Sequence, residues 1–111
     1  MRYLMIHRIA EDVTLNPEQE ERHDADQAAW DTEMDARGIL ISGGRLRPDS
    51  DATTVRLRSG EVLVSDGPFA ETKEQVAGYT VLECASLDEA IEIVARHPTG
   101  RIGTFELRPF G

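Results

Sequence analysis

Two helix-start signals lie far apart in the 111-residue sequence, and each follows a strand-like stretch. The segment Asn16-Pro17-Glu18-Gln19 combines an N-cap residue, a proline at the first helical position and a glutamine three residues after the cap. Ser86-Leu87-Asp88-Glu89 is a capping box of the same kind. We expect the first helix to run to about Arg37 and stop at Gly38, and the second to end at Pro98. The rest of the chain then has to form strands and loops.

Strand patterns flank both helices and predict the order of elements. Paired glycines at Gly43-Gly44 indicate a bulge or a close approach of another backbone, and Ser59-Gly60 is a two-residue hairpin signal. The expected strands are residues 3–9, 39–46, 52–58, 61–65, 76–84 and 102–107. This order predicts one α+β domain over residues 1–111, a ferredoxin-like split βαβ fold with an inserted β-hairpin. Apolar residues on both faces of the strands predict a homodimer, in which a second subunit covers the open face.

The charge of the chain is unevenly distributed. There are 21 acidic against 12 basic side chains, a formal net charge of -9, and residues 11–36 alone hold ten acids and one base. Binding to nucleic acid or to an anionic membrane surface is therefore not expected, because both need a basic footprint. Asp31 and Asp35 form an i, i+4 carboxylate pair, but nothing resembles a calcium-binding loop, so we expect a solvated acidic face and no metal or cofactor.

The expected location is cytoplasmic. The longest aliphatic runs are too short to span a membrane, and the pair His7-Arg8 interrupts the first of them before it resembles the core of a signal peptide. Cys84 is the single cysteine, which excludes an intramolecular disulfide and fits a reducing compartment.

Residues 66–74, with the sequence Asp-Gly-Pro-Phe-Ala-Glu-Thr-Lys-Glu, resemble the DGPF subgroup of the YCII-related family. Similar segments are Gly43-Gly44-x-Leu46, residues 52–56, Gly78-Tyr79, residues 87–90 and Glu106-x-Arg108-Pro109, so the resemblance covers essentially the whole chain. It implies a dimeric α+β barrel with a shared cleft, and some relatives accompany extracytoplasmic-function sigma factors. Some family members carry a catalytic pair of a helix-1 histidine and an aspartate. Counted back from Gly38, that histidine would fall at Gln27, so the pair is not transferred to this chain.

The turn at residues 66–69 is the first candidate site. Gly67 tolerates positive φ and Pro68 fixes its own φ, so together they hold Asp66 and Phe69 in a set geometry. Asp66 is a candidate general base or a group that orients a ligand. The alternative is a purely structural Asx-turn.

Three further side chains are candidates for ligand contacts or proton transfer. Lys73, the single lysine, is suited to an anionic ligand, or else pairs with a neighbouring glutamate. Arg56, with Arg58 on the same strand face, is suited to clamp a carboxylate or phosphate, or else lies on a solvated hairpin face. His7 has an ordinary pKa near neutrality and is the second proton-transfer candidate, or else is a satisfied core histidine.

Together these observations predict a small molecule bound in a cleft at the dimer interface, with acid–base catalysis by Asp66 and His7 as an open question. In this interpretation Phe69 forms a wall, Lys73 or Arg56 meets an anion, and the cleft comes mostly from the charge-balanced part of the chain. His23 lies on the helical face of Trp30 and either lines the cleft rim or pairs at the surface. The alternative function is a non-catalytic regulatory module whose acidic first helix binds a basic protein.

Overall fold

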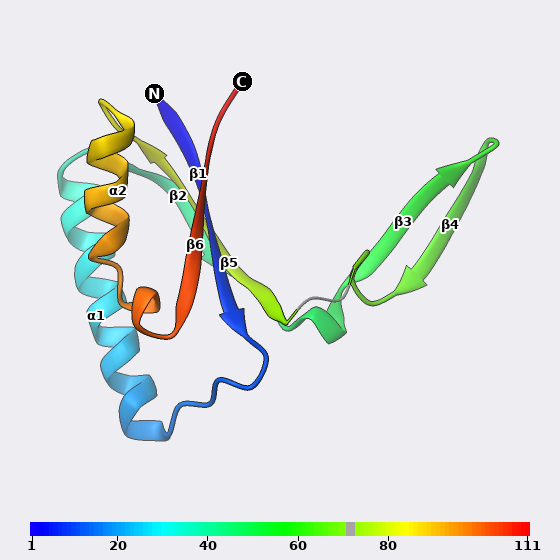
Figure 1. The fold of residues 1–111 in the computed structure, drawn as a ribbon, viewed down its shortest axis with the longest axis horizontal. Helices are drawn as coiled ribbons and strands as arrows, with labels where there is room; N and C mark the ends of the chain where they lie inside the picture. Colours follow the sequence, from blue (N-terminus) through cyan, green and yellow to red (C-terminus); the bar gives the residue numbers. More distant parts are fainter. Residues whose placement is uncertain (71–72) are drawn as a thin grey trace.

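The structure, a computed structural model, describes residues 1–70 and 73–111. A four-stranded antiparallel sheet in the order β2-β5-β1-β6 carries both long helices on one face (Figure 1). In chain order the elements are β1 (Arg2–Ala10), α1 (Pro17–Ala36), β2 (Leu40–Arg45), β3 (Thr53–Arg58), β4 (Glu61–Asp66), β5 (Glu74–Glu83), α2 (Leu87–Ala95) and β6 (Gly103–Pro109). Short 3-10 helices occupy Asp49–Asp51 and Pro98–Arg101. The predicted order, an α+β ferredoxin-like fold with an inserted hairpin, is confirmed.

The helix ends follow the local signals in the sequence. The Asn16 side chain accepts a hydrogen bond from the Gln19 amide at 2.8 Å, and the Gln19 side chain accepts one from the Asn16 amide at 3.0 Å. This reciprocal pair satisfies two amides that the first turn leaves without helical partners. Gly38 has a φ of +72°, the left-handed conformation that ends many helices. At α2, the Ser86 hydroxyl accepts from the Glu89 amide at 3.2 Å.

The core lies between the sheet and the C-terminal part of α1. Tyr3, Met5 and His7 of β1 face the helices, while Leu4 and Ile6 alternate to the open face. The buried apolar residues are Tyr3, Met5, Trp30, Met34, Ile39, Leu82, Cys84, Ala90, Ile93 and Val94. From α1 this core contains Trp30 and Met34, both from the second half of the helix.

The apolar stripe of α2 lies on a different face from the one expected. The sequence predicts Leu87, Ala90, Ile91, Val94 and Ala95 against the core. Only Ala90 and Val94 of that set are buried, together with Ile93, while Leu87 and Ile91 are about half exposed. The buried face is the one that meets α1. Ala90, Ile93 and Val94 share the core with Trp30 and Met34, and the Trp30 indole Nε1 donates a hydrogen bond to the Ile93 carbonyl at 3.0 Å.

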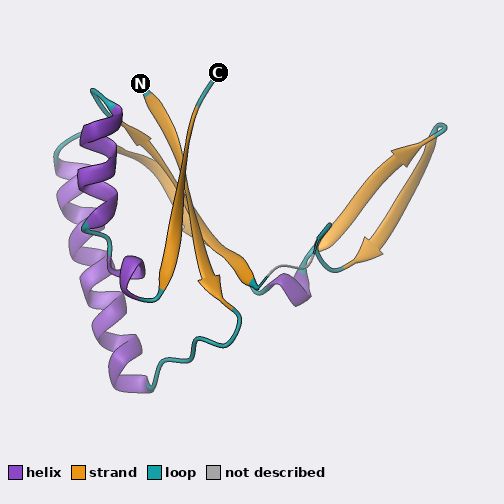
Figure 2. Cartoon of the chain, in the orientation of Figure 1, coloured by secondary structure: helices purple, strands orange, loops and turns teal. Residues whose placement is uncertain are grey.

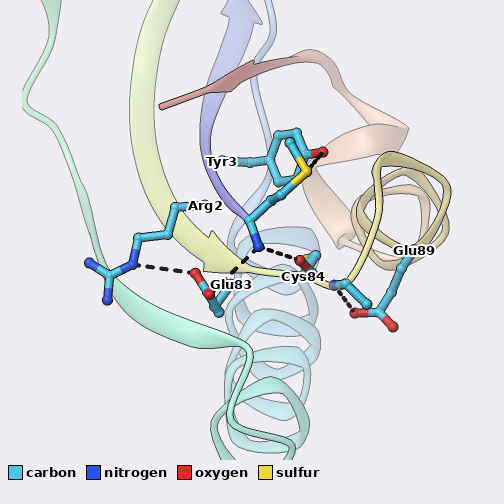
Figure 3. Close-up of polar contacts among 7 residues, drawn as sticks. Arg2, Tyr3, Glu83, Cys84 and Glu89 are labelled. Atoms are coloured by element: carbon cyan, nitrogen blue, oxygen red, sulfur yellow. Dashed lines mark hydrogen bonds and ion pairs between the residues drawn. The ribbon is translucent and has the colours of Figure 1, made fainter. Parts of the chain in front are cut away.

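Two close approaches fix strand positions in the sheet. A β-carbon at Gly43 would lie 2.9 Å from the Tyr79 carbonyl oxygen, which explains a glycine at this position of β2. The amino terminus donates to the Cys84 carbonyl at 2.9 Å, and both it and Arg2 pair with Glu83 (Figure 3). These contacts tie the start of β1 to the end of β5.

Strands β3 and β4 form a hairpin arm, residues 53–66, that extends away from the main sheet (Figure 2). Ser59 and Gly60 both have positive φ, 51° and 80°, the geometry of a two-residue hairpin turn. The exposed apolar side chains of the arm are Val55, Leu57, Val62, Leu63 and Val64. Within the described residues the arm pairs only with itself, and an isolated two-stranded hairpin is marginally stable in water.

In the described part of the chain, no helix is long and apolar enough to cross a membrane.

Candidate functional site

A cavity of about 480 Å³ lies between the sheet and the stretch of α1 from Glu20 to Asp31. Its size is typical of sites for small molecules. The wall from α1 is polar and consists of Glu20, His23, Asp24, Gln27 and Asp31. The sheet contributes His7, Ile9, Leu40, Gly43, Gly44, Arg45, Ala77, Gly78, Tyr79 and Thr80, and Val13, Thr14, Leu15, Leu46, Thr99 and Ile102 come from the connections.

His7 lies in the sheet wall of this cavity and is only 8% exposed. Its Nε2 is 2.9 Å from the Thr80 hydroxyl on β5. Gly78 is the partner of His7 across the strands, and a β-carbon there would lie 3.7 Å from His7 Nδ1. The missing side chain at Gly78 leaves Nδ1 open toward the cavity, and no residue of the described chain hydrogen-bonds to it.

The three histidines of the sequence are connected through short contacts, and two of them, His7 and His23, line the cavity. His97 contacts His7 edge to face with ring centroids 4.9 Å apart, and it also contacts Trp30 at 4.8 Å. Its Nδ1 accepts a hydrogen bond from the Thr99 amide at 3.1 Å, and the Thr99 hydroxyl is 3.4 Å from His23 Nε2. Burial lowers the pKa of His7 to about 4 and that of His97 to about 3, and it also lowers the pKa of His23. His7 and His97 are therefore uncharged near neutral pH.

Ion pairs hold the polar part of α1 against the body. Asp24 accepts from Arg45 of β2 at 2.8 Å, and Asp26 accepts from Arg101 at 2.9 Å. Near the other end, Glu33 accepts from Arg96 at 2.6 Å. Hydrogen bonds from the arginines lower the pKa of Asp24 and of Glu33. Some of the acidic side chains of α1 thus neutralise arginines from other parts of the fold.

Asp31 differs from these paired carboxylates. It is half-buried in the cavity wall, and burial raises its pKa. It has neither a hydrogen bond nor an ion pair within residues 1–70 and 73–111. Asp31 is therefore a half-buried carboxylate of the cavity wall that no cation of the described chain neutralises.

The turn that the sequence singles out lies elsewhere. Asp66 ends β4 with an exposed side chain, and it does not line the cavity. Gly67 has a φ of +92°, as expected for this turn, and its amide donates to the Ala52 carbonyl at 2.7 Å. Pro68 is half-buried beside it. The Asp66 side chain makes no hydrogen bond to any described residue, so the Asx-turn alternative is not formed among them.

Two of the other candidates meet at the base of the arm. The Arg56 guanidinium lies over the Phe69 ring, 4.9 Å from its centroid, and Phe69 is 74% exposed. Lys73 is exposed, and Glu71 and Thr72 of the same motif lie outside the described residues. Asp66, Phe69, Lys73 and Arg56 are thus separate from His7, and their roles as catalytic or ligand-binding residues stay predictions.

The described residues contain no group of three or more His, Cys, Asp or Glu side chains arranged to hold a metal ion. The chemistry that the cavity offers is that of an open imidazole nitrogen, hydroxyl groups and carboxylates.

Sequence reasoning missed the cavity wall of α1. Positions 20, 23, 24, 27 and 31 recur at helical spacing and continue into Trp30 and Met34. A polar stripe on α1 that continues the line of its apolar stripe could have predicted that these polar residues also face the sheet. His23, placed on this face by its spacing from Trp30, is half-buried and lines the cavity instead of pairing at the surface.

Comparison with known proteins agrees with this architecture. Residues 1–110 match the model of the YCII-related domain. An uncharacterised protein of Rhizobium meliloti (strain 1021) is 40% identical over 94 residues, which are 83% of this chain and 76% of the relative. A solved structure of 5-chloro-2-hydroxyhydroquinone dehydrochlorinase (TftG) from Burkholderia phenoliruptrix AC1100, in complex with 2,5-dihydroxybenzoquinone, is similar with a TM-score of 0.59. That likeness, at 16% identity over 100% of this chain and 94% of the other, shows a shared fold. The chain belongs to the YCII-related domain family.

Proposed function

We propose that this protein binds a small molecule in the cavity between α1 and the sheet, and that His7 exchanges a proton with it. The observation that carries the proposal is the position of His7. Its Nε2 is held by the Thr80 hydroxyl at 2.9 Å, and Nδ1 is open toward a cavity of about 480 Å³. A buried imidazole with one nitrogen fixed and the other open is suited to general acid–base chemistry.

Burial sets the protonation state in which His7 would act. Because the pKa of His7 is lowered to about 4, the ring is neutral at pH 7 and ready to accept a hydrogen bond or a proton. The similar fold of a dehydrochlorinase that binds 2,5-dihydroxybenzoquinone supports the choice of a small molecule as the ligand, but its substrate is not transferred to this chain.

The experiment compares His7 with Asp66. A metabolite library is screened by thermal shift on the wild type and on His7→Gln and Asp66→Asn. We expect His7→Gln to lose the response to ligand and Asp66→Asn to keep it, because Asp66 is exposed and outside the cavity. Loss of the response in Asp66→Asn alone would move the site to the turn at residues 66–69, as the sequence suggests.

A homodimer is part of the proposal. The exposed apolar side chains of the hairpin arm and the open face of the sheet, which bears Leu4 and Ile6, both favour burial against a second copy. Leu57 and Val62 face each other across the arm and are 68% and 63% exposed. Light scattering should give a dimer for the wild type and a monomer for Leu57→Ser/Val62→Ser. A monomeric wild type would refute this part of the proposal.

A regulatory role in the cytoplasm, linked to an extracytoplasmic-function sigma factor, is the second candidate. It is favoured by acids of α1 that the body leaves unpaired, such as the exposed Glu21 and Asp35, which have no ion-pair partner among the described residues. The free, buried Cys84 suits a reducing compartment. Neutralising Glu21 and Asp35 should then weaken capture of a basic partner in a salt-sensitive way, with the ligand response unchanged. Unchanged capture would exclude this role for α1.

A further inference from the structure

The charges around the cavity have one predominant sign. Among its lining residues, Glu20, Asp24 and Asp31 are acidic, and Arg45 is the single Lys or Arg. Arg45 is already paired with Asp24 at 2.8 Å. Most of the lining residues come from the charge-balanced part of the chain, but the acidic helix forms one wall and contributes all three of these carboxylates.

Among the carboxylates of the cavity wall, Asp31 would be stabilised most by a positively charged ligand. It is half-buried, and no cation of the described chain pairs with it. A carboxylate that is partly withdrawn from water is stabilised by an opposite charge, and this stabilisation is larger in the partly buried position than at the surface. By contrast, Asp24 on the same wall has its own arginine.

The histidines of the wall add polar atoms without adding positive charge. His7 is more than nine-tenths buried, and its Nδ1 has no partner among the described residues and is open toward the cavity. His23 lies on the opposite wall, 3.4 Å from the Thr99 hydroxyl. The remaining surface includes apolar side chains from Ile9, Leu40 and Ile102. The site thus offers carboxylates from α1, neutral polar atoms on both walls, and hydrocarbon on the sheet and its connections.

We propose that the ligand of this cavity is a small organic cation, an ammonium group on a hydrocarbon body. The ammonium pairs with Asp31, and the hydrocarbon packs on Ile9, Leu40 and Ile102. The inference rests on the proposed function and deepens it by naming the class of ligand. An anionic ligand is disfavoured here, because it would meet uncompensated carboxylates and no free guanidinium or ammonium in the cavity wall.

The test uses three probes of one shape that differ in charge at pH 7: benzylamine, benzyl alcohol and benzoate. Each is titrated into the full-length protein, and binding is followed by the backbone amide NMR signals of Gly78 and Thr80. We expect benzylammonium to bind at least about tenfold more tightly than benzyl alcohol, with no measurable binding of benzoate. Asp31→Asn should weaken benzylammonium about tenfold and leave benzyl alcohol unchanged.

Asp35→Asn is the matched control, since Asp35 lies one helical turn further along α1, is exposed and does not line the cavity. It should change none of the three affinities. The inference is overturned if benzoate binds as tightly as benzylammonium, if Asp31→Asn has no more effect than Asp35→Asn, or if benzylammonium at millimolar concentration leaves both signals unchanged. If benzyl alcohol or benzoate bound at Gly78 and Thr80 as tightly as benzylammonium, the charge preference would be overturned and the proposed small-molecule site would still be supported.

Discussion

The two halves of α1 face the same sheet, but one half packs into the core and the other half lines a cavity. The C-terminal half places Trp30 and Met34 in the core, where Met34 is fully buried. The N-terminal half places the polar residues Glu20, His23 and Asp24 over a cavity, and the wall of this cavity continues along α1 to Gln27 and Asp31. The difference shows that a helix can be anchored by one half and leave the other free to form a site.

The stability of the interface should therefore be concentrated at one end. Buried apolar side chains contribute roughly 1.5–3 kcal/mol each when fully removed from water, whereas half-exposed polar groups contribute little. The cavity walls instead contain groups that are costly to bury, above all His7 of β1 and Asp31 of α1. Four experiments test this contrast.

Truncation of Met34 should have the largest effect. Because its side chain is fully buried, Met34→Ala leaves a cavity in the core and should lower the free energy of unfolding by about 2–5 kcal/mol. The matched change on the cavity wall of α1, Gln27→Ala, should cost less than about 1 kcal/mol. Urea unfolding of both variants gives the comparison. Equal losses would show that the polar half packs as tightly as the apolar half.

Acidification should destabilise the protein through the buried histidines. The folded pKa of His7, about 4, lies below its ordinary value of 6.5, so the unfolded state binds the proton more readily. The free energy of unfolding is therefore unaffected by the protonation of His7 above pH 6.5. It decreases as the pH falls toward 4, by about 3 kcal/mol for His7 alone. His97, with a pKa of about 3, acts in the same direction. The urea concentration at the midpoint of unfolding of the wild type should fall steadily as the pH is lowered from 7 to 4.

The variant His7→Gln separates this effect from general acid sensitivity. It removes the titrating group, so the slope of stability against pH should become shallower, whatever the absolute stability of the variant. An unchanged slope would mean that His7 is not a buried neutral histidine.

Much of the fold follows from local signals in the sequence. The two capping segments, Gly38 and the Ser59-Gly60 turn act over a few residues, and each lies where the sequence predicts it. The geometry of the turn at Gly67 was predictable for the same reason.

The site was harder to predict because it depends on contacts distant in sequence. His7 faces Gly78 only through the register of β1 with β5, and Asp31 reaches the cavity only because Trp30 and Met34 set the rotation of α1. Neither the register nor the rotation can be obtained from local spacing alone. The sequence did place His7 among its candidates, but on chemical type, without its neighbours.

The Trp30 indole should have an intermediate effect. Trp30→Phe keeps an aromatic ring beside His97 but removes the hydrogen bond from Nε1 to the Ile93 carbonyl, 3.0 Å long. The Ile93 carbonyl still accepts from the Arg96 amide, so no buried acceptor is left without a partner. The expected loss is roughly 1–2 kcal/mol, measured by urea unfolding. A loss as large as that of Met34→Ala would mean that the indole itself fills space that a smaller ring cannot.

The smallest effect should come from the ion pair that fastens the polar half of α1. Asp24 and Arg45 are both well exposed, and water and salt screen their attraction. Asp24→Asn, Arg45→Gln and the double variant form a double-mutant cycle, which isolates the pair from other contacts of either residue. We expect a coupling energy that is measurable at low salt and vanishes at high salt. A coupling that persisted at high salt would mean that the pair is shielded from water and anchors α1 as firmly as the core does, which would remove the contrast between the two halves of the helix.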